Sequence, residues 1–188
     1  RAAMDSGVAR APITDWTAYE ESLTERMTHQ PKLMRLLQNR AALSPKRVIF
    51  PEANRMNVLR AAYIAYEEGS AIPILMGNRE RLEGMMKEND MNMDVEIIDT
   101  RSPETRPMVE RFAQIYWQEH QRKGITWYDA TRTMTRRDFF GAMMLHEGMA
   151  DAMVNGYSKN LSTASEPLFT VIGAAPEAGV MATVNIVN

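Results

Sequence analysis

Short apolar runs alternate along this chain with segments of helical periodicity, and this order constrains the fold more than any other feature. The stretch 46–69 begins with a basic pair and a β-branched run, turns at Pro51 and Glu52, and continues at helical spacing until Gly69. Strands that are separated by helices pair in parallel, because a parallel pair needs a long crossover connection. The sequence therefore predicts a three-layer αβα fold of the α/β class, with a mostly parallel sheet.

The same pattern recurs to the end of the chain. We predict strands at 48–50, 71–77, 95–99, 151–156 and 180–187. The predicted helices lie at 15–27, 31–43, 56–68, 78–87, 103–122, from 126 onward, 136–147 and 161–173. Pro73 favours an edge or strand-start position, because proline donates no backbone hydrogen bond to a neighbouring strand. Residues 1–14 lack any periodicity, and we interpret them as the tail of an upstream part followed by a linker.

Composition excludes several classes of function. The chain has 188 residues, 24% of them charged and 45% hydrophobic, with a formal net charge of −2, which argues against an electrostatic nucleic-acid binder. It has no cysteine and three isolated histidines, so we expect no metal site. There is no leader-like segment and no apolar run near 18 residues. We therefore expect a soluble, cytoplasmic protein that binds neither membranes nor nucleic acid.

Candidate ligand-binding positions follow from the fold class, since ligands of open α/β sheets bind at the carboxyl ends of the strands. Neither a dinucleotide-binding fingerprint nor a P-loop occurs. The strand exits to consider are Pro51-Glu52, Gly77-Asn78, Asp99-Thr100 and Gly156-Tyr157-Ser158. A basic cluster could hold phosphates, although a solvated helix face is the more frequent arrangement. It comprises Arg122, Lys123, Arg132, Arg136 and Arg137.

Several motifs resemble those of phosphate acetyltransferases. The first is KRVIFPEANRMNVLRAAYIAYEEGSAIPILMGN, and it is followed in the same order by QRKGIT, FFGAMMLHEGMADAMVNG and a Ser-Thr-rich stretch before Pro167. Near the start, AAMDSGVARAPITDWTAYEESL resembles the end of the catalytic part of bacterial hybrid malic enzymes, which join a malic enzyme to a phosphate-acetyltransferase-like region. The resemblance implies a truncated fold of the phosphate acetyltransferase and isopropylmalate dehydrogenase type.

The resemblance also implies a division into four parts. Residues 1–14 would end the malic-enzyme part, and 15–44 would form a helical connector. Residues 45–150 would form the first α/β domain, and 151–188 the incomplete start of a second. An incomplete second domain leaves apolar surface that another chain covers, so we expect self-association into a homo-oligomer.

Departures from the family pattern bear on catalysis. The resemblance implies arginines where this chain has His120 and Glu166, and an acidic pattern with an arginine where it has Ala53-Asn54-Arg55 and Asn57. The missing cations would bind phosphates or stabilise the oxyanion of acyl transfer. The Ser and Asp residues of the family's later half would lie beyond Asn188. We therefore expect no catalytic residue here.

Two functions compete, and an unrelated α/β binding protein is a third possibility. The first is a non-catalytic regulatory and assembly region that senses acetyl-CoA, in a parent protein that oxidatively decarboxylates malate to pyruvate with NADP and Mg²⁺ or Mn²⁺. This region itself would hold no cofactor. The alternative is an active phosphate acetyltransferase that moves acetyl between CoA and phosphate.

Residues at the family's motif positions are expected to face the acetyl-CoA or phosphate cleft. They are Glu52, His120, Gly156, Tyr157, Ser158, Ser162, Thr163 and Glu166. Pro51 and Asn57 belong with Glu52 to the exit of the first strand. Glu52 has an alternative role as a carboxylate stabilised by a helix N-terminus, and 158–163 could be only a helix cap and turn.

Overall fold

The computed structural model describes residues 15–27 and 32–174 and divides the chain into two units, with Gln38 as the start of the second. The first two helices are α2 (Trp16–Met27) and α3 (Lys32–Leu43). Asp15 caps α2 by accepting a hydrogen bond from the backbone N–H of Ala18, as expected of an aspartate at that position. No helix among the described residues is long and apolar enough to cross a membrane.

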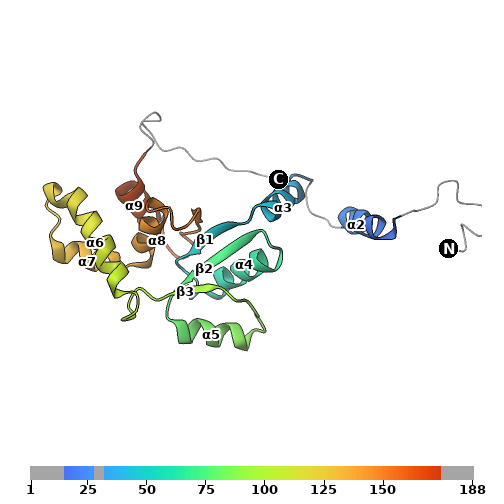
Figure 1. Ribbon diagram of the computed structural model, residues 1–188, viewed down its shortest axis with the longest axis horizontal. Helices are drawn as coiled ribbons and strands as arrows, with labels where there is room; N and C mark the ends of the chain where they lie inside the picture. Colours follow the sequence, from blue (N-terminus) through green and yellow to red (C-terminus); the bar gives the residue numbers. More distant parts are fainter. Residues whose placement is uncertain (1–14, 28–31, 175–188) are drawn as a thin grey trace, which may run out of the picture. The chain divides into compact units, whose positions relative to one another are not determined.

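The second unit contains a four-stranded parallel sheet in the order β3-β2-β1-β4. Figure 1 labels the first three of these strands, β3, β2 and β1. Its strands are β1 (Lys46–Phe50), β2 (Ala71–Met76), β3 (Glu96–Ile98) and β4 (Ala152–Met153). The helices between and after them are α4 (Met56–Glu67), α5 (Arg79–Glu88), α6 (Arg106–His120), α7 (Trp127–Met134), α8 (Arg137–His146) and α9 (Leu161–Pro167). A 3₁₀ turn, η1 (Gln121–Lys123), follows α6, and a π-helical turn, η2 (Leu168–Ile172), follows α9.

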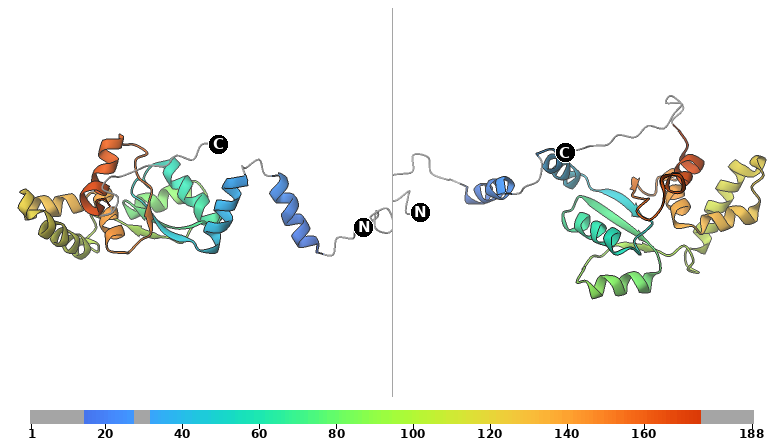
Figure 2. Two further views of the ribbon diagram at one scale, coloured as in Figure 1. Left: turned by 90° about the horizontal axis from the view of Figure 1, so that it is seen from above. Right: turned by 180° about the vertical axis from the view of Figure 1, so that it is seen from behind.

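Helices cover both faces of this sheet, which confirms the predicted three-layer α/β fold. Alternate strand residues point to opposite faces. Phe50, Leu75 and Ile97 pack against α4 and α5, whereas Ile49 and Ile74 pack against α6, α7 and α8. Figures 1 and 2 show these two helical layers on either side of the strands.

Pro73 lies near the start of β2, which agrees with the strand-start alternative, although β2 as a whole is an interior strand of the sheet. It pairs with Val48 of β1, but β3 begins its pairing only at Ile74. At Pro73, β2 therefore has a neighbour on one side alone. A missing N–H costs little there, because no second strand is present to accept its hydrogen bond.

Helix α8 approaches the sheet closely at Gly141. An added Cβ at this position would lie 2.8 Å from the Sδ atom of Met153 and 3.3 Å from Cγ2 of Ile49. Phe140 and Met144 of the same helix are fully buried beside it. The absence of a side chain at Gly141 thus lets the helix backbone rest directly on β1 and β4.

The predicted elements agree with the structure except at some boundaries. The helix expected from Pro103 begins at Arg106, and the strand expected over 151–156 is paired only at Ala152 and Met153. Because β4 pairs with β1, contacts cross the expected domain boundary at 150, and the division into domains stays a prediction. The strand expected at 180–187 lies outside the described residues.

Candidate functional site

A polar pocket of about 750 Å³ lies at the carboxyl ends of the strands. Each of the four expected strand exits contributes to its lining. The contributing residues are Pro51, Glu52, Gly77, Asn78, Asp99, Thr100 and Ser158. Parallel strands end at the same edge of a sheet, so residues from distant parts of the sequence meet there. The position of the candidate site thus follows from the topology.

Cations outnumber carboxylates in this pocket. The cationic side chains are Arg55, Arg81, Arg101, Arg136, Arg137 and Lys159, and the carboxylates are Glu52, Asp99 and Asp138. Guanidinium groups bind phosphate and carboxylate oxygens through two parallel hydrogen bonds. The pocket is therefore suited to an anionic ligand that carries phosphate groups.

Arg137 is half-buried at the edge of the sheet. Its Nη1 atom donates hydrogen bonds of 3.1 Å to the Asn54 side chain and of 3.1 Å to the Met76 carbonyl at the end of β2. Burial lowers the pKa of Arg137, and the positive charge of Arg101 lowers it further, although the surrounding carboxylates oppose this shift. Two arginines that repel each other would both gain from a bound anion.

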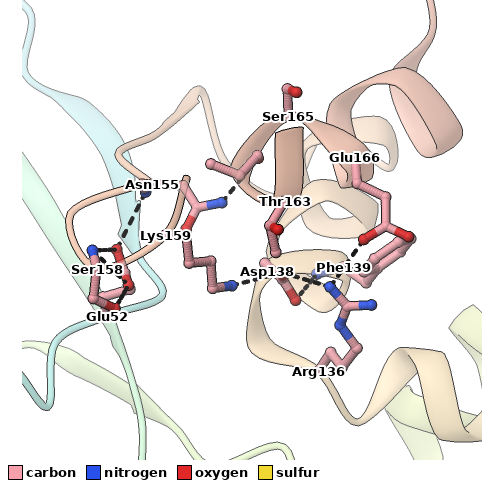
Figure 3. Close-up of polar contacts among 12 residues, drawn as sticks. Glu52, Arg136, Asp138, Phe139, Asn155, Ser158, Lys159, Thr163, Ser165 and Glu166 are labelled. Carbon is pink, nitrogen blue, oxygen red and sulfur yellow. Dashed lines mark hydrogen bonds and ion pairs between the residues drawn. The ribbon is translucent and has the colours of Figure 1, made fainter. Parts of the chain in front are cut away.

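Glu52 connects the end of β1 to the loop after β4. Its carboxylate accepts hydrogen bonds from the backbone N–H groups of Gly156 at 3.2 Å, Tyr157 at 2.7 Å and Ser158 at 3.2 Å, and from the Ser158 hydroxyl (Figure 3). Gly156 has φ +101°, a conformation that suits glycine and helps to turn successive N–H groups toward Glu52. The structure thus brings four of the expected site residues together as an internal clamp.

The hydrogen bonds of this clamp favour the ionised form of the Glu52 carboxyl. Burial alone raises the pKa of a carboxyl, but the Ser158 hydroxyl and the three backbone N–H groups outweigh burial, so the pKa of Glu52 is lowered. The side chain is only 5% exposed. Glu52 therefore stays ionised while it holds the loop, and its role differs from the helix-terminal carboxylate considered from the sequence. Asn57 supports the same loop by donating a 2.6 Å hydrogen bond to the Tyr157 hydroxyl.

A second polar network links the pocket to α9 (Figure 3). Asp138, which is 2% exposed, accepts hydrogen bonds from Nζ of Lys159 at 2.7 Å and from Nη2 of Arg136 at 3.1 Å. The same Nη2 atom donates to Oε2 of Glu166 at 3.2 Å. Burial raises the pKa of Asp138, but the bonds and charges of Lys159 and Arg136 outweigh it and hold this pKa below its usual value.

His120 lies apart from the pocket lining. It is 6% exposed, its Nδ1 atom lies 2.9 Å from the Tyr116 carbonyl oxygen, and its ring stacks on Tyr116 at 4.3 Å between centroids. Ser162 and Thr163 are exposed on the first turn of α9, where the Asn160 side chain accepts from the Thr163 N–H. The capping role considered for this segment is thus present.

Several residues that line the pocket were not predicted from the sequence. Arg81 and Arg101 each follow a strand exit by a few positions, and this spacing is a signal that could have found them. Asp138 and Lys159 gave no comparable signal, because their contact depends on how α8 meets the loop after β4. Within the described ranges, no group of three acidic or histidine side chains is placed to hold a metal ion.

Comparison with known proteins gives consistent results. The phosphate acetyl/butaryl transferase family matches residues 32–188. The chain is 35% identical to an NADP-dependent malic enzyme of Salmonella typhimurium over 161 residues, which are 83% of this chain and 21% of that protein. It is 32% identical to a phosphate acetyltransferase of Synechocystis over 147 residues, 78% of this chain and 21% of that protein. The chain thus spans about a fifth of the length of these curated relatives.

Solved structures show the same fold. A phosphotransacetylase from Streptococcus pyogenes superposes with a TM-score of 0.66 at 27% sequence identity, covering 77% of this chain and 43% of that one. The EutD phosphotransacetylase from Staphylococcus aureus gives a TM-score of 0.64 at 21% identity over 77% of this chain and 43% of that one. The sheet and its covering helices are therefore an arrangement found in phosphotransacetylases.

Proposed function

This chain belongs to the phosphate acetyl/butaryl transferase family, and on that premise we propose that it is a non-catalytic regulatory region that binds acetyl-CoA. Its parent would be a malic enzyme, which converts malate to pyruvate with NADP and Mg²⁺ or Mn²⁺ held by the upstream part. The similarity to NADP-dependent malic enzymes supports this parent.

The proposal rests on the residues at positions 120 and 166, where the family resemblance implies arginines and this chain has His120 and Glu166. His120 is buried against Tyr116, outside the pocket lining, so it offers no cation to a ligand there. At position 166, where the resemblance implies an arginine, the chain has a glutamate that pairs with Arg136. Acyl transfer to phosphate needs positive charge at the developing oxyanion, and both positions lack it.

Anion binding, in contrast, is well supported by the pocket. Six cationic side chains surround it, and acetyl-CoA carries several phosphate charges that arginine recognises well. Regulation requires only that a ligand binds one conformation more tightly than another. A region that has lost catalytic cations but kept a cationic pocket therefore fits the role of a sensor.

The test measures malic activity of the full-length protein as acetyl-CoA is added. We expect the activity to fall with acetyl-CoA, and the double variant Arg81→Gln with Arg101→Gln to need a higher concentration for the same effect. The matched control is the double variant Arg60→Gln with Arg106→Gln, because both arginines are exposed and lie outside the pocket lining. Its malic activity should respond to acetyl-CoA like that of the wild type. Malic activity that does not change with acetyl-CoA would refute sensing.

A second assay separates this function from the alternative. The same protein is given acetyl phosphate and CoA, and formation of acetyl-CoA is followed. We expect no turnover above background. Turnover at the rate of a dedicated phosphate acetyltransferase would instead establish the enzyme and overturn the regulatory proposal.

We also propose that the protein self-associates in the cytoplasm. Apolar side chains are exposed on α9, on η2 and just after β4, with Leu161 at 81%, Phe169 at 58% and Val154 at 54%. We propose that these side chains contribute to one apolar surface, and contiguous surfaces of that kind often mark an interface. Light scattering on the full-length protein tests this proposal, and a monomer at micromolar concentration would contradict it.

A further inference from the structure

Arg136 is held in place by buried groups, while part of its guanidinium is left without a partner. Asp138 binds its Nη2 atom, and the guanidinium carbon lies 4.5 Å from the centroid of the Phe139 ring. Asp138 and Phe139 are each only 2% exposed, so this support is rigid. Within residues 15–27 and 32–174, no acceptor contacts Nε or Nη1 of Arg136, and the side chain lines the pocket. It is thus oriented to receive an anion.

Glu166 is a different kind of partner for Arg136. It lies on α9, its side chain is 50% exposed, and its bond is shared with Asp138 on the single atom Nη2. Ion pairs with this much exposure are weak, whereas a phosphate group offers more charge and can accept two parallel bonds from one arginine. A phosphate in the pocket is therefore a stronger partner for Arg136 than the Glu166 carboxylate.

We propose that Glu166 is an internal anion, which a phosphate group of the bound ligand displaces from Arg136. Asp138 keeps Arg136 in place during this exchange, and Pro167 and Val171 remain buried, so only the exposed part of α9 is loosened from the start of α8. This inference rests on the proposed function, because it supplies the two conformations that a sensor needs. It commits the site to ligands with a phosphate or diphosphate group.

The test uses inorganic pyrophosphate as the probe and compares Glu166→Gln with the wild type in calorimetric titrations. Loss of the competing carboxylate should tighten pyrophosphate binding roughly twofold to fivefold, the range that a weak exposed ion pair allows. Glu110→Gln is the matched control, because Glu110 is 51% exposed and pairs with Arg106 on α6, outside the pocket lining. It should bind pyrophosphate like the wild type.

Hydrogen exchange provides the second readout. Saturating pyrophosphate should speed amide exchange in 161–167 of the wild type by roughly twofold to fivefold, and Glu166→Gln without ligand should exchange there at the same raised rate. Unchanged exchange in the wild type, equal affinity of Glu166→Gln and wild type, or no binding of pyrophosphate at millimolar concentration would each overturn the displacement. If pyrophosphate moves α9 but acetyl-CoA leaves malic activity unchanged, the displacement stands and the proposed function fails.

Discussion

Glu52 shows how one side chain can join two distant parts of the chain. Its carboxylate accepts hydrogen bonds from 156–158, more than a hundred positions later in the sequence. Glutamine at this position would keep one acceptor oxygen, but its amide group would face N–H donors. We expect Glu52→Gln to lower the free energy of unfolding by about 1–3 kcal/mol in urea titrations, since buried donors lose an ionised acceptor.

The control for this variant is Glu96→Gln. Glu96 lies on β3, its side chain is 49% exposed, and it pairs with Arg47. An exposed pair of this kind contributes at most about 1 kcal/mol. A loss at Glu52 no larger than the loss at Glu96 would show that the clamp does not stabilise the fold.

Asp138 leads to a prediction about pH. Its pKa in the folded protein lies below the usual value of 3.8, so its ionised form is stabilised by folding. This contribution is complete above the usual pKa and is lost as the pH falls through the lower, folded value. We expect Asp138→Asn to cost about 2–4 kcal/mol in the free energy of unfolding at neutral pH, because Lys159 and Arg136 lose their shared partner.

The difference between Asp138→Asn and the wild type should shrink at acid pH. Once the wild-type carboxyl is protonated, it resembles asparagine in charge and no longer attracts the two cations. Urea unfolding at about pH 7 and about pH 3 checks this expectation. An equal difference at both pH values would contradict an ionic role for Asp138.

At the scale of elements, two helical glycines provide a matched pair. Gly141 of α8 lies against Met153 and Ile49, whereas a Cβ at Gly84 of α5 would meet nothing within 4 Å. Alanine favours a helix over glycine by about 1 kcal/mol. We therefore expect Gly84→Ala to stabilise the protein by up to about 1 kcal/mol, and Gly141→Ala to destabilise it by about 1–2 kcal/mol because the added methyl group overpacks the layer. Thermal unfolding of both variants gives the comparison, and stabilisation by Gly141→Ala would show that α8 can move away from the sheet.

The order of the elements could be predicted from the sequence, because strands and helices differ in the period of their apolar residues. The convergence of the strand exits followed from parallel pairing alone. The short length of β4 could not be predicted, since 156–158 bond to Glu52 instead of extending the strand. The ion pair between Asp138 and Lys159 could not be predicted either, because only tertiary packing brings α8 to the loop after β4.

The whole molecule combines a negative net charge with a cationic pocket. The formal charge of the chain is −2, yet six arginine and lysine side chains line one pocket against three carboxylates. A local excess of this kind attracts anions even though the net charge of the chain is negative, because nearby charges dominate the potential inside a cleft. Binding of an anionic ligand should therefore depend strongly on ionic strength.

We expect pyrophosphate affinity to fall at least about tenfold as salt is raised from about 0.1 M to about 1 M, where the screening length shrinks from about 10 Å to about 3 Å. Arg81→Gln with Arg101→Gln should bind more weakly and show a shallower dependence on salt, because two of the charges that attract the ligand are gone. The double variant of Arg60 and Arg106, which lie outside the pocket lining, carries the same change in net charge and should keep the wild-type dependence. If both double variants behave alike, net charge governs binding, and the arrangement of cations at the strand exits does not.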